Sequence, residues 1–169
     1  MTQTLAIGCD EAAYSLKVTL KKHLAKHYPN LRVTDFGAGS GEIVLYPDIG
    51  YTVAAAVARG EYERAILVCG TGIGMSICAN KVPGIRAAVC HDPFSTERSR
   101  KSNDTQIMCL GERVIGEELA KYLVDLWLSC DFAGGDSAPK VARINELEKQ
   151  YSTEKNDRNG NCENYSYQT

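Results

Sequence analysis

The sequence lacks a large excess of either charge, a long hydrophobic run and any regular cysteine spacing. Its 169 residues carry 19 Lys and Arg against 21 Asp and Glu, a formal net charge of −2. We therefore expect neither nucleic acid nor an anionic membrane as a partner. The longest apolar run, Val53 to Ala58, is far too short to span a bilayer. Asp10 and Glu11 interrupt the N-terminal segment before a secretory apolar core could form, so we expect a cytoplasmic protein.

The seven cysteines are odd in number, and no two are spaced C-x-x-C. A disulfide framework or a zinc site would need pairs at short, regular intervals. Most of the cysteines lie in or beside apolar segments, where a free thiol packs as a small hydrophobe. His23 and His27 are four residues apart, a spacing that suits a metal on a helix, but no third ligand is evident nearby. We predict no metal site and a chemical role for one cysteine at most.

Short apolar runs alternate with segments of helical period along most of the chain. Five runs are predicted as strands buried in a parallel sheet: Thr4–Cys9, Leu31–Phe36, Arg64–Cys69, Ile85–Val89 and Gln106–Leu110. The predicted helices are Ala12–Tyr28, Pro47–Arg59, Ile73–Lys81, Pro93–Lys101, Glu117–Ser129 and Ala138–Tyr151. This order predicts an α/β fold with a doubly wound parallel sheet of about five strands in a three-layer sandwich.

No linker divides this pattern, so residues 1–151 are predicted to form a single domain. Leu16, Leu20 and Leu24 define the buried face of the first helix, and Lys17 is expected to face solvent. From residue 152 onward the sequence is polar and has no helical period. We expect residues 152–169 to form a disordered tail in which Cys162 is exposed.

The most informative segment is CGTGIGMS, from Cys69 to Ser76, which follows a predicted strand and opens a predicted helix. Ligands of a doubly wound sheet bind outside the carboxyl ends of its strands, where this segment lies. Gly70, Gly72 and Gly74 let the backbone approach a ligand, and outward N–H groups at a helix start favour an anion. A tight turn without a ligand is the alternative. A dinucleotide fingerprint is disfavoured, because Met75 stands where its last glycine would be.

Cys69 immediately precedes this loop. The N-terminus of a helix favours the thiolate form of a cysteine. A thiolate beside a backbone anion hole can remove a proton adjacent to a carbonyl while the amides hold the resulting enediolate. The alternative is a buried structural cysteine, and the position before the loop favours the chemical role.

Four segments carry a family resemblance: AILVCGTGIGMSICAN, KVPGIRA, SNDTQ and LGERVIG. Over residues 4–150 the chain resembles the ribose-5-phosphate isomerase B / galactose-6-phosphate isomerase family. The resemblance implies a Rossmann-like sandwich without metal or cofactor. It also implies a homodimer or dimer of dimers whose active sites are shared between subunits. The implied reaction moves a proton between carbons 1 and 2 of an open-chain sugar phosphate.

On the family's pattern Cys69 is the base and Thr71 helps to handle the sugar oxygens. Asp10 would hydrogen-bond substrate hydroxyls, and Asn103 completes the catalytic set. Some members use a loop glutamate as the base, but Met75 occupies that position here. The residues expected to line the substrate and anion hole are Gly70, Gly72, Ile73, Gly74, Ser102 and Glu11.

Two loops depart from the family's pattern. Glu11 stands where most members have histidine, and we expect it to point to solvent or to pair with a cation. Ser102 stands where the family's ring-opening histidine precedes the asparagine. His91 lies in a different loop, and we expect a structural role for it, through Asp92 or as a cap of the next helix.

The late basic cluster also differs. The family commonly has two arginines four residues apart after Gly-Gly, and Asp136 and Lys140 occupy those positions here. Lys140 can bind phosphate as a point charge, without the fork of an arginine. Arg113 matches an arginine position and is the other expected phosphate ligand.

The missing imidazole suggests a substrate. Ribose 5-phosphate rests mostly as a furanose, because its hydroxyl on carbon 4 closes a ring that an acid/base must open. A four-carbon sugar phosphorylated on carbon 4 has no such hydroxyl. The family includes tetrulose-phosphate isomerases, so we predict interconversion of D-erythrulose 4-phosphate and D-erythrose 4-phosphate. The alternatives are a ribose-5-phosphate isomerase and a non-catalytic sugar-phosphate-binding module.

Overall fold

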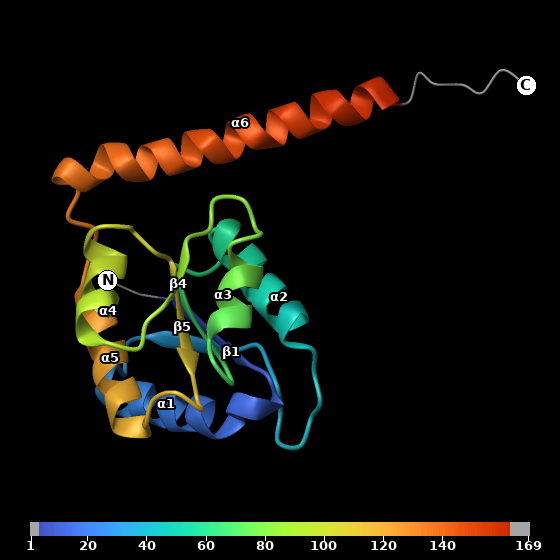
Figure 1. Cartoon of the computed structure of the whole chain (residues 1–169). Coiled ribbons are helices and arrows are strands. Elements are labelled where there is room, and N and C mark those ends of the chain that lie inside the picture. The colour runs from blue at the N-terminus through green and yellow to red at the C-terminus, as the bar shows by residue number, and fades with distance from the viewer. Residues whose placement is uncertain (1–3, 163–169) are drawn as a thin grey trace, which may run out of the picture. The chain divides into compact units, whose positions relative to one another are not determined.

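The computed structural model describes residues 4–162 and contains one five-stranded parallel sheet (Figure 1). Its strands are β1 (Thr4–Cys9), β2 (Arg32–Asp35), β3 (Arg64–Cys69), β4 (Ala87–Val89) and β5 (Ile107–Gly111). They lie in the order β2-β1-β3-β5-β4. Every predicted strand is present within two residues of its predicted ends, and the doubly wound prediction is confirmed.

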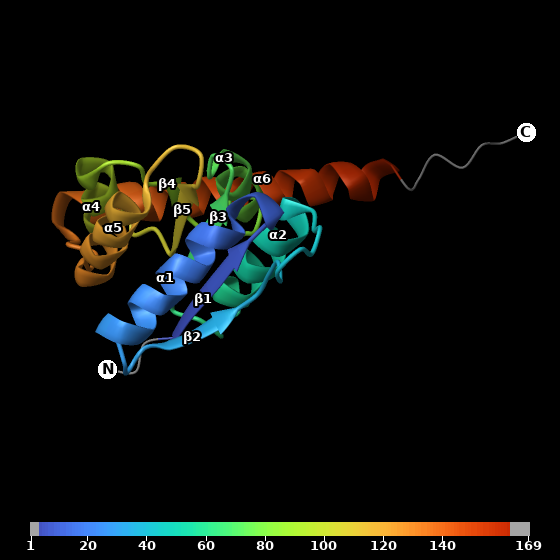
Figure 2. The same ribbon diagram turned by 90° about the horizontal axis from the view of Figure 1, so that it is seen from below.

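Helices cover both faces of the sheet, as a three-layer sandwich requires (Figures 1 and 2). One face carries α1 (Tyr14–His27), α4 (Pro93–Lys101) and α5 (Glu117–Ser129), and the other carries α2 (Tyr46–Ala58) and α3 (Ile73–Ala79). A 3₁₀ turn, η1 (Glu11–Ala13), precedes α1. The central strands β1, β3 and β5 are buried on both sides, which explains their near-continuous hydrophobic runs, whereas the edge strands β2 and β4 are only partly buried.

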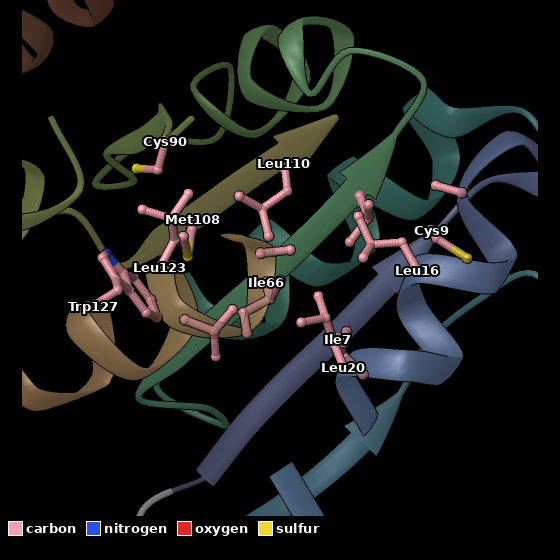
Figure 3. Packing of buried hydrophobic residues seen from close by; sticks show 14 of the residues in the cluster. Ile7, Cys9, Leu16, Leu20, Ile66, Cys90, Met108, Leu110, Leu123 and Trp127 are labelled. Carbon is pink, nitrogen blue, oxygen red and sulfur yellow. The ribbon is translucent and has the colours of Figure 1, made fainter. Parts of the chain in front are cut away.

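Alternate residues of the strands pack into two separate cores. Met108 packs with Leu123 and Trp127 beneath α5 (Figure 3), whereas its neighbour Cys109 packs on the opposite face with Met75 of α3. Met75 is fully buried in that core, so in this chain its side chain faces the sheet. Among the side chains described, six cysteines are free thiols and five of them are buried.

The prediction that Lys17 faces solvent is wrong. Lys17 is only 3% exposed, and its Nζ lies 2.9 Å from Oδ1 of Asp35. The same ammonium donates to the carbonyl oxygens of Gly37 and Ala38. Burial of this cation is possible because it finds one carboxylate and two carbonyl acceptors at the end of β2. Lys17 thereby ties α1 to the segment that leads into α2.

The chain divides into two compact units, residues 1–133 and 134–169, and the single domain over residues 1–151 stays a prediction. The second unit contains a 3₁₀ turn, η2 (Gly135–Ser137), and helix α6 (Ala138–Cys162). Residues 152–162 are helical, which differs from the disordered tail expected there. Glu and Lys are good helix formers, so a helix can continue without an apolar period. Residues 163–169 and the exposure of the Cys162 side chain lie outside the described part of the chain.

Within residues 4–162, no helix combines the length and the apolar character that crossing a bilayer demands.

Candidate active site

The carboxyl ends of β1, β3 and β5 lie side by side, and the predicted glycine loop follows β3. The register pairs Cys9 with Val68 and Cys69 with Gly111. Asp10, the residue after β1, is therefore next to Cys69 at the end of β3. The loop after β5 meets the same edge.

The thiol of Cys69 is held by the glycine loop that follows it. The side chain is buried, and its Sγ accepts a hydrogen bond from the N–H of Gly72 at 3.2 Å. Gly72 has φ +75°, and a Cβ there would lie 3.0 Å from the backbone carbonyl carbon of Leu110. The neighbouring N–H of Ile73 donates to Oγ1 of Thr71 at 3.3 Å. A backbone donor is thus already directed at the sulfur, where it favours a negative charge.

Arg113 lies over the same loop. Its backbone N–H donates to the carbonyl oxygen of Gly70 at 3.1 Å. Its Nε and Cζ lie 3.6 and 3.7 Å from the position that a Cβ on Gly70 would occupy. A guanidinium beside outward-facing backbone amides is a suitable site for a phosphate or another anion.

Asp10 offers an unused acceptor to this site. It is 8% exposed, and its Oδ1 has no hydrogen-bond partner within the described residues. Burial and the neighbouring Glu11 raise the pKa of Asp10, while Arg113 opposes that shift. A buried acceptor without a partner is costly, and a substrate hydroxyl would satisfy it.

Glu11 does not pair with a cation among the residues described. It is exposed, and its Oε2 accepts a hydrogen bond from the N–H of Val44 at 3.4 Å. This contact joins the start of η1 to the segment between β2 and α2. Of the two expected roles, the solvent-facing one fits the structure, with this backbone contact in addition.

Sequence reasoning missed Tyr46, whose ring forms a wall of the glycine loop. A Cβ on Gly74 would lie 2.6 Å from Cε2 and 2.8 Å from Cζ of Tyr46, so any larger residue at position 74 would displace this ring. Tyr46 is 41% exposed. No spacing in the sequence links residues 46 and 74. Only packing of α2 against α3 brings them together.

His91 supports the site from the next loop. Its Nε2 accepts a hydrogen bond from the N–H of Gly111 at 2.9 Å, and a Cβ on Gly111 would lie 2.7 Å from the carbonyl carbon of Thr71. Burial lowers the pKa of His91, while Asp92 opposes that shift. Asp92, rather than His91, caps α4 by accepting from the N–H of Ser95 at 2.7 Å. The contacts of His91 are those of a structural residue that braces the end of β5.

Ser102 and Asn103 lie at the opposite side of the sheet from Cys69, where the strands begin. They follow α4 and precede β5, and the carbonyl oxygen of Asn103 accepts from Nε of Arg86, the residue just before β4. Cys69 lies at the carboxyl edge, and the five residues of β5 separate the two edges by about 15 Å. One copy of the chain therefore does not bring Asn103 to its own Cys69.

Lys140 and Asp136 belong to the second unit, on α6 and η2. Lys140 is exposed, and its role in phosphate binding stays a prediction.

The paired histidines of α1 have neighbours that explain them without a metal. Nε2 of His23 lies 2.7 Å from Oδ1 of Asp125, and its ring stacks on that of His27. Among the residues that the structure describes, no three His, Cys, Asp or Glu side chains are grouped so as to hold a metal ion.

The fold and the site together define an α/β protein with a glycine loop at the carboxyl ends of its strands, beside a buried thiol and a carboxylate with one unsatisfied oxygen, an arrangement that can hold an anionic ligand. Residues 5–144 match the Ribose/Galactose Isomerase family, and the chain belongs to that family.

Individual relatives cover nearly the same range. The chain is 52% identical to D-erythrulose-4-phosphate isomerase of Pectobacterium atrosepticum, over 87% of this chain and 96% of that protein. It is also 52% identical to ribose-5-P isomerase B of Listeria innocua, over 86% and 97% of the two chains. The structure of Clostridium thermocellum ribose-5-phosphate isomerase B superposes with a TM-score of 0.84 at 48% identity, over 88% and 99% of the two chains. These findings confirm the resemblance, the Rossmann-like fold and the enzyme class, an aldose–ketose isomerase.

Proposed function

We propose that this protein interconverts D-erythrulose 4-phosphate and D-erythrose 4-phosphate, with Cys69 as the base. The observation that carries the chemistry is the hydrogen bond from the Gly72 N–H to the Cys69 sulfur. It stabilises a thiolate at the mouth of a loop that can also hold an anionic intermediate.

The reaction is a balanced proton shift. The Cys69 thiolate removes a proton from carbon 1 of the ketose, and the electron pair forms a double bond between carbons 1 and 2. The enediolate that results takes the proton back on carbon 2, while the hydroxyl proton of oxygen 1 is transferred to oxygen 2. Thr71 and Asp10 lie beside the base, where they can hydrogen-bond these oxygens, and Arg113 holds the phosphate.

Ser102 supports a four-carbon substrate. A tetrose 4-phosphate cannot close a five-membered ring onto carbon 4, so it needs no ring-opening imidazole at this position. Overall identity does not decide between substrates, because the erythrulose-phosphate and ribose-phosphate relatives are equally similar to this chain. The substrate assignment therefore depends on the serine at position 102.

The distance between the two ends of the strands supports a shared active site. Cys69 and Asn103 can act on one substrate only if Asn103 comes from a second copy of the chain. Exposed apolar side chains near the carboxyl edge favour such pairing: Leu45 is 71% exposed, Ile73 55% and Ile77 58%. We propose a homodimer, alone or within a dimer of dimers, with Lys140 as a further phosphate ligand and a cytoplasmic location.

A substrate panel tests the assignment. We expect kcat/KM to be highest for erythrulose 4-phosphate, compared with ribose 5-phosphate and allose 6-phosphate. A Ser102→His variant restores the imidazole, and it should raise kcat/KM for ribose 5-phosphate more than for the tetrulose. A dominant ribose 5-phosphate activity in the unaltered protein would refute the substrate argument. Binding without turnover of any of the three sugars would favour the non-catalytic alternative.

A further inference from the structure

The turn that carries Asn103 has an unusual backbone. Asp104 has φ +47° and is the one non-glycine residue with positive φ in the described part of the chain. Aspartate tolerates this left-handed conformation better than most residues, but glycine would adopt it without strain. The choice of aspartate at this position therefore calls for a reason beyond conformational freedom.

The carboxylate of Asp104 lies between two largely buried guanidinium groups. Its Oδ2 is 3.0 Å from Arg86, and its Oδ1 is 3.0 Å from Arg100. These arginine side chains are 15% and 9% exposed, whereas the carboxylate itself is 32% exposed. Asp104 thus joins the residue before β4 to the end of α4.

The same two arginines bind the backbone of the turn. Nε of Arg86 donates to the carbonyl oxygens of Asn103 and Asp104, each at 3.1 Å. Arg100 donates to the carbonyl oxygen of Thr105. The N–H of Asn103 is bound to the carbonyl oxygen of Arg98 at 3.3 Å. The backbone N–H and carbonyl oxygen of Asn103 are thus both hydrogen-bonded within the chain, while the residue is exposed to solvent.

We infer that Asp104 and Arg86 are positioning residues that hold Asn103 in the orientation needed by the active site of a second copy. This inference rests on the proposed shared site. Backbone strain that the surroundings hold in place is often found at functional positions, and here it adjoins the predicted catalytic residue of this edge. The alternative is that the network only stabilises the connection between α4 and β5.

The test is a double-mutant cycle on kcat with erythrulose 4-phosphate. Asp104→Asn keeps the size and the tolerance for positive φ but removes the charge, and Asn103→Ala removes the side chain that Asp104 is proposed to position. Asp104→Asn alone should lower kcat by about tenfold with little change in KM. In the Asn103→Ala background it should lower kcat by less than about twofold, because the group it positions is absent.

Asp131→Asn is the matched control. It breaks an ion pair of 2.6 Å with Arg64, another buried arginine, whose other hydrogen bonds go to the carbonyl oxygens of Trp127 and Leu128 rather than to the turn. Its kcat should stay within about twofold of the unaltered protein. Should Asp104→Asn fold poorly, Asp104→Gly relieves the backbone strain and still lacks the carboxylate, so it should show the same loss of kcat.

The inference is overturned if Asp104→Asn retains full kcat, or if it lowers kcat by the same factor in both backgrounds. Failure of the proposed function would give a different result. In that case Asn103→Ala itself would retain full kcat.

Discussion

The N–H of Gly72 donates a hydrogen bond of 3.2 Å to Sγ of Cys69. This contact joins the end of β3 to the first turn of α3. Gly72 is the N-cap of α3 and has a left-handed backbone, so the chain turns from the strand end into the helix at this residue. A buried thiol otherwise resists ionisation, as at Cys109, whose pKa burial raises well above its ordinary value. Cys69 packs in the same core but differs from Cys109 in that a backbone N–H of the loop is directed at its sulfur.

Gly72→Ala should lower activity as well as stability, because its Cβ would collide with the backbone in addition to having an unfavourable φ. The added Cβ would lie 3.0 Å from the backbone of Leu110 and would have φ +75°. Gly60→Ala is the matched control, with φ +77° and open space around its Cβ. Both should lose about 1–2 kcal/mol of unfolding free energy from the left-handed conformation. Only Gly72→Ala should also lower kcat/KM, by about tenfold or more. Equal activities of the two variants would contradict the proposed role of the loop.

Mixing two inactive variants tests the shared active site. Cys69→Ala and Asn103→Ala homodimers should each have little activity. When the two are unfolded and refolded together, half of the dimers are mixed, and each mixed dimer contains one intact site. About a quarter of the activity of the unaltered protein should return. If Cys69 and Asn103 of the same copy act together, mixing restores nothing.

His91 predicts a pH dependence. Its Nε2 can accept from the N–H of Gly111 only while that nitrogen is unprotonated. Burial lowers the pKa of His91 in the folded protein below that of the unfolded chain. The unfolded state therefore binds the proton more readily. The stabilisation is fully present above about pH 6.5 and is lost as the pH falls through the folded-state pKa.

His91→Gln keeps an acceptor but cannot titrate in this range, so it should weaken this acid-dependent loss. Unfolding free energies of both proteins, measured from pH 7.5 to pH 5, check the prediction. Parallel curves would show that His91 does not contribute to the loss.

Lys17→Met should be strongly destabilising, although the apolar pattern of α1 predicts that Lys17 faces solvent. It would leave Asp35 and the carbonyls of Gly37 and Ala38 without their buried cation. We expect a loss of about 2–4 kcal/mol in the free energy of unfolding by urea. Lys21→Met removes the other, 41% exposed partner of Asp35 and should cost less than about 1 kcal/mol. Similar losses for the two variants would contradict the role assigned to Lys17.

Local patterns were sufficient to predict the architecture. The strands Thr4–Cys9 and Arg64–Cys69 and the helices Pro93–Lys101 and Glu117–Ser129 begin and end where the sequence predicts. Each is an apolar run or a periodic segment bounded by glycine, proline or polar residues, so local information suffices. The prediction that Lys17 faces solvent was wrong because the burial of Lys17 depends on non-local contacts. Its acceptors come from a distant segment of the chain.

The site was predicted only in part, for a topological reason. Cys69, Thr71 and the glycines occupy one continuous segment, and the parallel register adds Asp10 and Arg113 to the same edge. Asn103 matches the family's motif, but a motif does not say at which end of the sheet its residue lies. The contact of Tyr46 with the glycine loop depends on packing between α2 and α3, which leaves no signal in residue spacing.

The central claim is that Cys69 moves a carbon-bound proton of a sugar phosphate. It is tested most directly by NMR spectroscopy of erythrulose 4-phosphate in D₂O, with the unaltered protein and with Cys69→Ala. The unaltered protein should convert ketose to aldose and introduce deuterium at the carbons that exchange protons, whereas Cys69→Ala should do neither while remaining folded. Conversion by Cys69→Ala at the full rate would contradict the account.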